Sequence, residues 1–174
     1  MIRSLARRFR RSERGSSTVE FVVVFPLIIT VFMSMFEGAV MTVQQAMLER
    51  ALDLTVRSLR LTTGTAPTRA QVAAKVCEYT NVIRDCEDSI IIELTPVPVP
   101  AFTLPNADVP CVDRANDVIP QHGFTNGVGN QLMLIRACVV VDPLFPMTGL
   151  GLALTKDASG GYQIKTASAY VGEP

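Results

Sequence analysis

The residue with the most unusual chemical setting is Glu20, a carboxylate at the beginning of a long apolar run. It lies five residues after Gly15 and directly before Phe21, and sixteen uncharged residues, 21 to 36, separate it from Glu37. An ionisable side chain at the centre of a bilayer costs roughly 3 kcal/mol, so such residues are more often functional than incidental. Glu20 is therefore a candidate functional residue, although the interfacial end of a simple anchor helix would also explain it.

Four cysteines, all of them after the apolar run, are the next candidates for chemistry. An even number of cysteines in an exported domain indicates disulfides. Four cysteines allow three pairings. We favour Cys77 with Cys86, which closes a short loop between a helix and a strand, and Cys111 with Cys138, which ties a proline-rich segment to a strand. A zinc site is disfavoured because the chain has no CxxC pair and a single histidine, His122.

The other polar residues do not form a known catalytic pattern. His122 lies in a polar stretch with Gly and Asn, 121–130, where a solvated loop residue is typical. The sequence has no GxSxG elbow, phosphate-binding glycine loop or HExxH motif. The carboxylates of Asp85, Glu87 and Asp88 lack the spacing of a calcium-binding EF-hand. We therefore predict no enzymatic activity, no catalytic residue, no cofactor and no metal site.

The apolar run has the length and the flanks of a membrane helix. Residues 21–36 span roughly 24 Å as a helix, and the apolar character continues from Gly38 to Val43, so a segment over about 20–43 can cross a core of ~30 Å. Six arginines and one glutamate give the first fifteen residues a charge of +5, which predicts a cytoplasmic N-terminus. A secretory signal peptide is the rival interpretation, but its apolar core is usually about 7–15 residues long.

The helical pattern continues beyond the apolar run, so that one helix is predicted over 16–64. Gly64 and Pro67 provide its end. Pro26 lies inside it, and a kink is expected because the proline ring crowds the carbonyl of Val22 and donates no hydrogen bond. A stripe of apolar residues at helical spacing is predicted to pack on the following domain. Its members are Val40, Val43, Met47, Ala51, Leu54 and Leu61.

The remaining residues, 65–174, are predicted to form a small domain outside the cytoplasm. Thr68 is expected to cap a short helix that ends at Tyr79, and strands are predicted over 90–95 and 131–142. Several prolines between those strands require an irregular crossing. A last hairpin is predicted from strands over 150–156 and 162–171. A long helix followed by a small antiparallel sheet belongs to the α+β class.

The formal net charge of zero conceals an asymmetry between the two ends of the chain. Without the first fifteen residues, ten Lys and Arg face fifteen Asp and Glu. A protein that binds nucleic acid needs a basic face to neutralise phosphates. Nucleic acid is therefore not a predicted partner of the exported part.

The segment from Gly15 through Glu20 and Phe21 into the apolar helix resembles the processing site of type IV prepilin-like proteins. It is most similar to that of the TadE-like pseudopilins of tight-adherence pilus systems. The resemblance implies that a membrane-embedded prepilin peptidase cuts between Gly15 and Ser16 and removes the basic leader, 1–15. The new amino group of Ser16 is mostly cationic at neutral pH and can pair with Glu20 of the same or a neighbouring subunit.

The resemblance extends more loosely over the C-terminal half, through the Pro-Leu-Phe-Pro segment 143–146 and a closing strand. It implies a subunit of the bacterial inner membrane, with its domain in the periplasm or carried into an extracellular pilus, that acts in pilus assembly and supports surface adhesion and biofilm formation. Its implied partners are the prepilin peptidase, other pilin or pseudopilin subunits, the assembly machinery and membrane lipid. TadE-like, TadF-like and other minor pilins stay open. The alternative is an unprocessed, membrane-anchored binding or scaffold protein.

Overall fold

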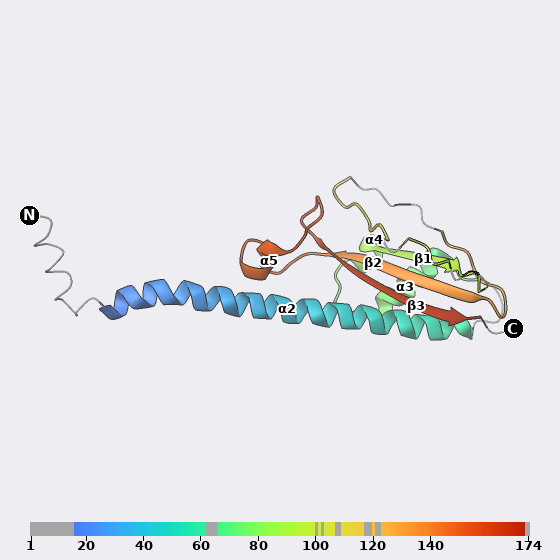
Figure 1. Cartoon of the computed structure of the whole chain (residues 1–174), viewed down its shortest axis with the longest axis horizontal. Helices are drawn as coiled ribbons and strands as arrows, with labels where there is room; N and C mark the ends of the chain where they lie inside the picture. The colour runs from blue at the N-terminus through green and yellow to red at the C-terminus, as the bar shows by residue number, and fades with distance from the viewer. Residues whose placement is uncertain are drawn as a thin grey trace, which may run out of the picture.

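The computed structural model describes residues 16–61, 66–99, 101, 103–106, 109–116, 120 and 123–172. Its elements, in chain order, are α2 (Ser16–Arg60), α3 (Arg69–Tyr79), α4 (Cys86–Ser89), β1 (Ile90–Pro96), β2 (Leu132–Val141), α5 (Gly149–Ala153) and β3 (Tyr162–Val171). The long helix α2 lies along the sheet with its C-terminal half and projects beyond it with its N-terminal half (Figure 1). These elements confirm the predicted α+β fold.

The three strands form an antiparallel sheet in which β2 is central. Ala137 of β2 pairs with Ile92 of β1 on one side and with Thr166 of β3 on the other. Each of the three strands agrees within about one residue with a predicted strand. Helix α2 ends at Arg60, and Leu61 lies in a turn, so the helix stops before the predicted end near residue 64. Residues 62–65 lie outside the described residues.

The predicted hairpin over 150–171 is wrong. Residues 149–153 form the short helix α5, and β3 pairs with β2 instead. Gly149 has a positive φ of 51°, which a strand does not use, and the N–H groups of Leu152 and Leu154 donate to carbonyls one turn back. The apolar residues of this segment predicted a strand. Its N–H groups instead donate within a helical turn, so they are not available to pair with another strand.

The main core lies between one face of the sheet and the helices α2 and α3. It is built almost entirely from aliphatic side chains, each of which contributes about 1.5–3 kcal/mol when it is fully buried. The fully buried members are Leu48, Ala51, Leu52, Val76, Ile92, Met133, Ile135, Ala137 and Val139. This core holds the C-terminal half of α2 against the domain.

The buried face of α2 is rotated from the predicted stripe. Val43, Leu54 and Leu61 are 52%, 38% and 63% exposed, whereas two polar residues, Gln44 and Thr55, are buried. The side-chain oxygen of Gln44 accepts a hydrogen bond from the hydroxyl of Tyr162 at 2.5 Å, and Thr55 donates to the carbonyl of Ala51 at 2.8 Å. The pattern of apolar residues therefore predicted the wrong buried face. Gln44 and Thr55 can lie on the buried face because their side chains make hydrogen bonds inside the domain.

The opposite face of β2 is covered by the proline-rich crossing. Val109, Cys111, Cys138 and Val140 form a second buried cluster, and a disulfide joins Cys111 to Cys138. Both faces of β2 are therefore shielded from water, which accounts for its nearly continuous apolar sequence.

A buried ion pair on that same face also fixes the crossing. Arg136 of β2 lies opposite Glu93 of β1, and its guanidinium donates to the Glu93 carboxylate at 2.6 Å. The guanidinium also donates to the backbone carbonyl of Asn106 in the crossing. The crossing is thus held by one covalent bond and by one buried charge that reaches its backbone.

Helix α3 begins at the predicted cap. The Thr68 hydroxyl accepts from the N–H of Gln71 at 3.3 Å, and the Gln71 side chain accepts from the N–H of Thr68 at 2.9 Å. This reciprocal arrangement is a capping box, which satisfies two N–H groups that the first turn leaves unpaired. The helix start predicted from Thr68 is confirmed.

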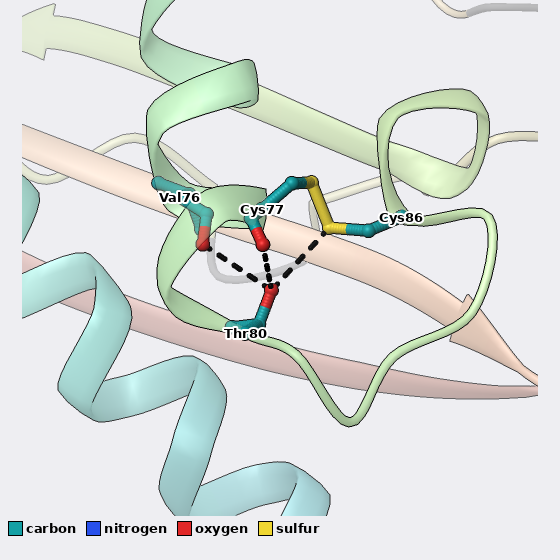
Figure 2. The surroundings of a disulfide bond; sticks show 4 residues. All are labelled: Val76, Cys77, Thr80 and Cys86. Carbon is teal, nitrogen blue, oxygen red and sulfur yellow. Dashed lines mark hydrogen bonds between the residues drawn. A yellow bond between two sulfur atoms is a disulfide. The ribbon is translucent and has the colours of Figure 1, made fainter.

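The other end of α3 is tied to α4 by a disulfide between Cys77 and Cys86. Figure 2 shows the Thr80 hydroxyl beside this bond, directed at the carbonyls of Val76 and Cys77 and at the sulfur of Cys86. Thr80 thus closes the last turn of α3, and the chain then reverses into α4 and β1. Both disulfides join the pairs favoured from the sequence.

Candidate functional site

The N-terminal half of α2 carries a continuous band of exposed apolar side chains. Contiguous apolar surface of this kind marks a membrane or protein contact. Within α2, an 18-residue stretch is apolar enough to cross a membrane and is not buried by the domain. This helix is a candidate membrane anchor. The exposed large residues of the band are Val19, Phe21, Val22, Val23, Val24, Phe25, Leu27, Ile28, Val31, Phe32, Met35 and Phe36.

The sequence-predicted residues of the processing site lie at the beginning of this helix. Ser16 is the first residue of α2, and Gly15 lies outside the described residues. Glu20 is exposed in the second turn, and the ring of Phe21 stacks on that of Phe25 at 5.1 Å. The carboxylate of Glu20 is thus accessible to a partner, and its roles in processing and in pairing stay predictions.

Helix α2 is continuous through Pro26. Two hydroxyls in the following turns bond back to the helix: Thr30 donates to the carbonyl of Leu27 at 2.9 Å, and Ser34 donates to the carbonyl of Thr30 at 2.7 Å. A hydroxyl that donates to a carbonyl of the preceding turn has a hydrogen-bond partner without water. The predicted kink at Pro26 stays a prediction.

In the sequence, Glu37 marks only the end of the uncharged run, but the structure gives it a specific role. Its side chain is 1% exposed, and each carboxylate oxygen accepts one backbone hydrogen bond. Oε1 accepts from the N–H of Leu144 at 3.1 Å, and Oε2 accepts from the N–H of Phe145 at 2.9 Å. Hydrogen bonds to a charged group contribute about 1.5–3 kcal/mol each. The partners lie more than a hundred residues away in the chain, so no local pattern could indicate them.

The segment held by Glu37 is residues 143–154, which we call the docking loop. It comprises the Pro-Leu-Phe-Pro segment noted above and the helix α5. Figure 1 shows α5 beside the middle of α2, beyond the end of the sheet. A second side chain of α2 also holds the loop, because the hydroxyl of Ser34 accepts from the N–H of Leu150 at 3.1 Å.

Close packing completes the contact between α2 and the docking loop. A Cβ added to Gly149 would collide with the hydroxyl of Ser34, so only glycine fits there, and its positive φ of 51° also favours glycine. On the other side of the contact, Gly38 of α2 lies against a methyl group of Leu150. The rings of Phe36 and Phe145 lie 6.4 Å apart. Loop and helix therefore meet through both polar and apolar contacts.

Negative charge near the docking loop affects one buried phenol. Burial, followed by the charges of Glu37 and Asp142, raises the pKa of Tyr162 to about 12. The phenol therefore stays protonated at neutral pH and keeps its hydrogen bond to Gln44. Asp142, directly before the loop, pairs with Arg114 at 2.5 Å, and this hydrogen bond lowers the pKa of the Asp142 carboxyl.

The arrangement is suited to binding and holding. In the part of the chain that the structure describes, no three side chains of His, Cys, Asp or Glu gather into a metal site. His122 lies outside the described residues. The chemistry of the described site is that of a carboxylate and a hydroxyl on α2 that hold the backbone of a distant loop.

A family model described as TadE-like protein matches residues 15–57. The N-terminal segment of this chain is TadE-like. This match confirms the TadE-like resemblance of the segment that contains Gly15, Glu20 and Phe21. The TadE-like segment contains both Glu20 and Glu37, whereas the docking loop lies outside it. Neither a curated protein nor a solved structure matches the chain.

Proposed function

We propose that the chain is a pseudopilin or minor pilin that a prepilin peptidase processes and that acts in the assembly of a tight-adherence pilus, and so in surface adhesion and biofilm formation. The observation that carries this proposal is the TadE-like segment itself. It begins at Gly15, and from Ser16 onward it lies in one helix whose first half is apolar and exposed. Such a helix can anchor the subunit in lipid and can pack against other pilin or pseudopilin helices.

The proposed processing step supplies a partner for Glu20. Cleavage after Gly15 removes the basic leader and leaves an ammonium group on Ser16, four residues before the carboxylate. In the apolar surroundings of a bilayer, a paired charge costs much less than an isolated one. Pairing of the Ser16 ammonium of one subunit with Glu20 of its neighbour would therefore favour a fixed register between the two helices.

The proposed topology has the leader in the cytoplasm, α2 in the inner membrane over about 20–43, and residues 65–174 in the periplasm. The basic leader supports a cytoplasmic N-terminus. Two disulfides in the domain support an oxidising compartment on the other side. The proposed partners are the prepilin peptidase, the inner-membrane assembly machinery and membrane lipid.

Mass spectrometry of the membrane-extracted protein tests the processing step. We expect wild type to begin at Ser16 and Gly15→Ala to begin at Met1. Gly38→Ala is the matched control, because an added Cβ there meets only ordinary van der Waals contact, and it should begin at Ser16. A wild-type chain that begins at Met1 would favour the unprocessed anchored scaffold. A start near residue 40 would identify a secretory signal peptide.

Glu20→Gln tests the assembly step separately. The variant should be trimmed as wild type is, because Gly15 is intact, and it should lose pilus assembly and surface adhesion because the charge partner of Ser16 is gone. Glu49→Gln, an exposed change on the same helix, is the control and should assemble normally. Normal adhesion by Glu20→Gln would contradict the pairing and leave the processing step standing.

A further inference from the structure

The docking loop is unusually apolar for a surface segment. The thirteen residues between Asp142 and Lys156 carry no charge. Three large apolar side chains project from it: Leu144, Met147 and Leu152 are 50%, 79% and 62% exposed. Three exposed apolar side chains on one uncharged loop call for a partner that is itself apolar.

The level at which the loop lies along α2 indicates that partner. The loop contacts α2 from Thr30, whose carbonyl would lie 3.2 Å from a Cβ on Gly149, to Gly38. Thr30 is ten residues after Glu20, which is about 15 Å along the helix axis. A hydrocarbon core of ~30 Å that begins near Glu20 therefore ends near Val40. A loop docked beside residues 30–38 then lies within the outer half of that core.

We propose that the docking loop is a second membrane-contacting element, in which Leu144, Met147 and Leu152 insert among the acyl chains of the outer leaflet. The inference rests on the membrane span of α2 in the proposed function. The apolar surface of the loop adjoins the exposed band of α2 at Phe36, whose ring faces that of Phe145. The apolar side chains of the helix and of the loop therefore meet at this ring contact, and lipid is a partner suited to both.

Several backbone N–H groups of the docking loop have acceptors within the protein, as a lipid environment requires. Irregular backbone is tolerated at membrane depth only where its polar groups are satisfied by protein or by water. Glu37 and Ser34 of α2 accept hydrogen bonds from three of the loop's N–H groups, and carbonyls within the loop accept from others. Pro143 and Pro146 have no N–H group. The donors are Leu144, Phe145 and Leu150 to α2, and Thr148, Leu152 and Leu154 to carbonyls within the loop.

The same contacts explain how a carboxylate is accommodated within the span. Glu37 is covered by the loop and has a donor on each oxygen, so it is not exposed to lipid. At the end of the loop, the ammonium of Lys156 donates to the carbonyl of Pro146 at 2.7 Å. This bond satisfies one carbonyl of the loop with a donor from the protein.

Quenching by lipids in reconstituted liposomes tests the proposal on the full-length protein. Met147→Cys is labelled with an environment-sensitive fluorophore in phosphatidylcholine vesicles that contain spin-labelled lipid, and iodide serves as the aqueous quencher. Phe32→Cys, on the exposed helix, is the membrane reference. Leu104→Cys, an exposed apolar position on the proline-rich crossing, is the aqueous control. We expect the label at 147 to lose fluorescence with spin-labelled lipid, as the label at 32 does, and the label at 104 to respond only to iodide.

Three results would overturn the inference, and they are distinguishable. Quenching of the label at 147 by iodide, with the label at 32 quenched by lipid, would overturn the loop's role and leave the anchor intact. Shielding of position 147 from both quenchers would mean that protein covers the loop. Failure of lipid to quench the label at 32 would overturn the membrane span together with this inference. Leu152→Cys provides a second labelled position if Met147→Cys prevents folding.

Discussion

Glu37→Ala should release the docking loop from α2 while the rest of the domain stays folded. The substitution removes the acceptor of two hydrogen bonds, those from the N–H groups of Leu144 and Phe145. At about 1.5–3 kcal/mol for each bond to a charged group, the gross loss is about 3–6 kcal/mol. A released loop can carry its freed N–H groups out to water, so we expect a net loss near the lower limit, about 3 kcal/mol.

Glu37→Gln provides an intermediate case. Glutamine keeps one acceptor oxygen and places an NH₂ group opposite the other N–H, so about half of the effect is expected. Glu49→Gln is the matched control. Glu49 is exposed on α2 and accepts a side-chain hydrogen bond from Gln45, so its change should be within about 0.5 kcal/mol. The expected order of destabilisation is Glu37→Ala, then Glu37→Gln, then Glu49→Gln.

Hydrogen exchange followed by mass spectrometry on the detergent-solubilised full-length chain measures this effect at the loop. A loss of about 3 kcal/mol corresponds to roughly 100-fold faster exchange of the peptide over 143–148. Peptides from β2, in the core, should exchange as in wild type. Unchanged protection of 143–148 in Glu37→Ala would refute the role assigned to this carboxylate. Equal loss in β2 would show that Glu37 supports the whole fold and not the loop alone.

Three further predictions concern the domain. Replacing both cysteines of the Cys111–Cys138 disulfide should lower the free energy of unfolding by about 1 kcal/mol more than replacing both cysteines of Cys77–Cys86, as measured by chemical denaturation. The reason is that the first bond joins residues 27 apart and the second joins residues 9 apart, so the first restricts the unfolded chain more. Arg136→Met should cost about 3–5 kcal/mol because it leaves the buried carboxylate of Glu93 unpaired, whereas exchanging both partners for apolar residues should be far milder in the same denaturation experiment. Because the pKa of Tyr162 is raised to about 12, the protonated phenol contributes stability that is fully present below pH 10 and is lost as the pH rises through 12. The ultraviolet titration of tyrosinate in wild type, compared with that in Tyr162→Phe, measures this pKa.

The elements of the fold were predictable where short-range chemistry defines them. Thr68 and Gln71 form the capping box that starts α3. Two apolar runs form β1 and β2, and a segment that alternates between buried and more exposed residues forms β3. The uncharged run after Glu20 predicted the apolar helix, because sixteen successive residues without a charge are typical of a helix that contacts lipid or other apolar surface. The strand predicted over residues 150–156 was wrong. Gly149 has a positive φ and the N–H of Leu150 donates to Ser34 of the distant helix α2, and neither feature could be read from the local pattern.

The sequence by itself determined which part of the chain is apolar, which is basic, where α3 and the three strands lie, and the TadE-like beginning of α2. These features depend on neighbours within a few residues, so composition and spacing are sufficient to indicate them. Only the tertiary structure decided which face of α2 is buried, and that Glu37 holds the backbone of the docking loop. The reason is physical: a polar residue is tolerated inside a protein when a distant part of the chain satisfies its hydrogen bonds, and only the folded chain brings that partner to it.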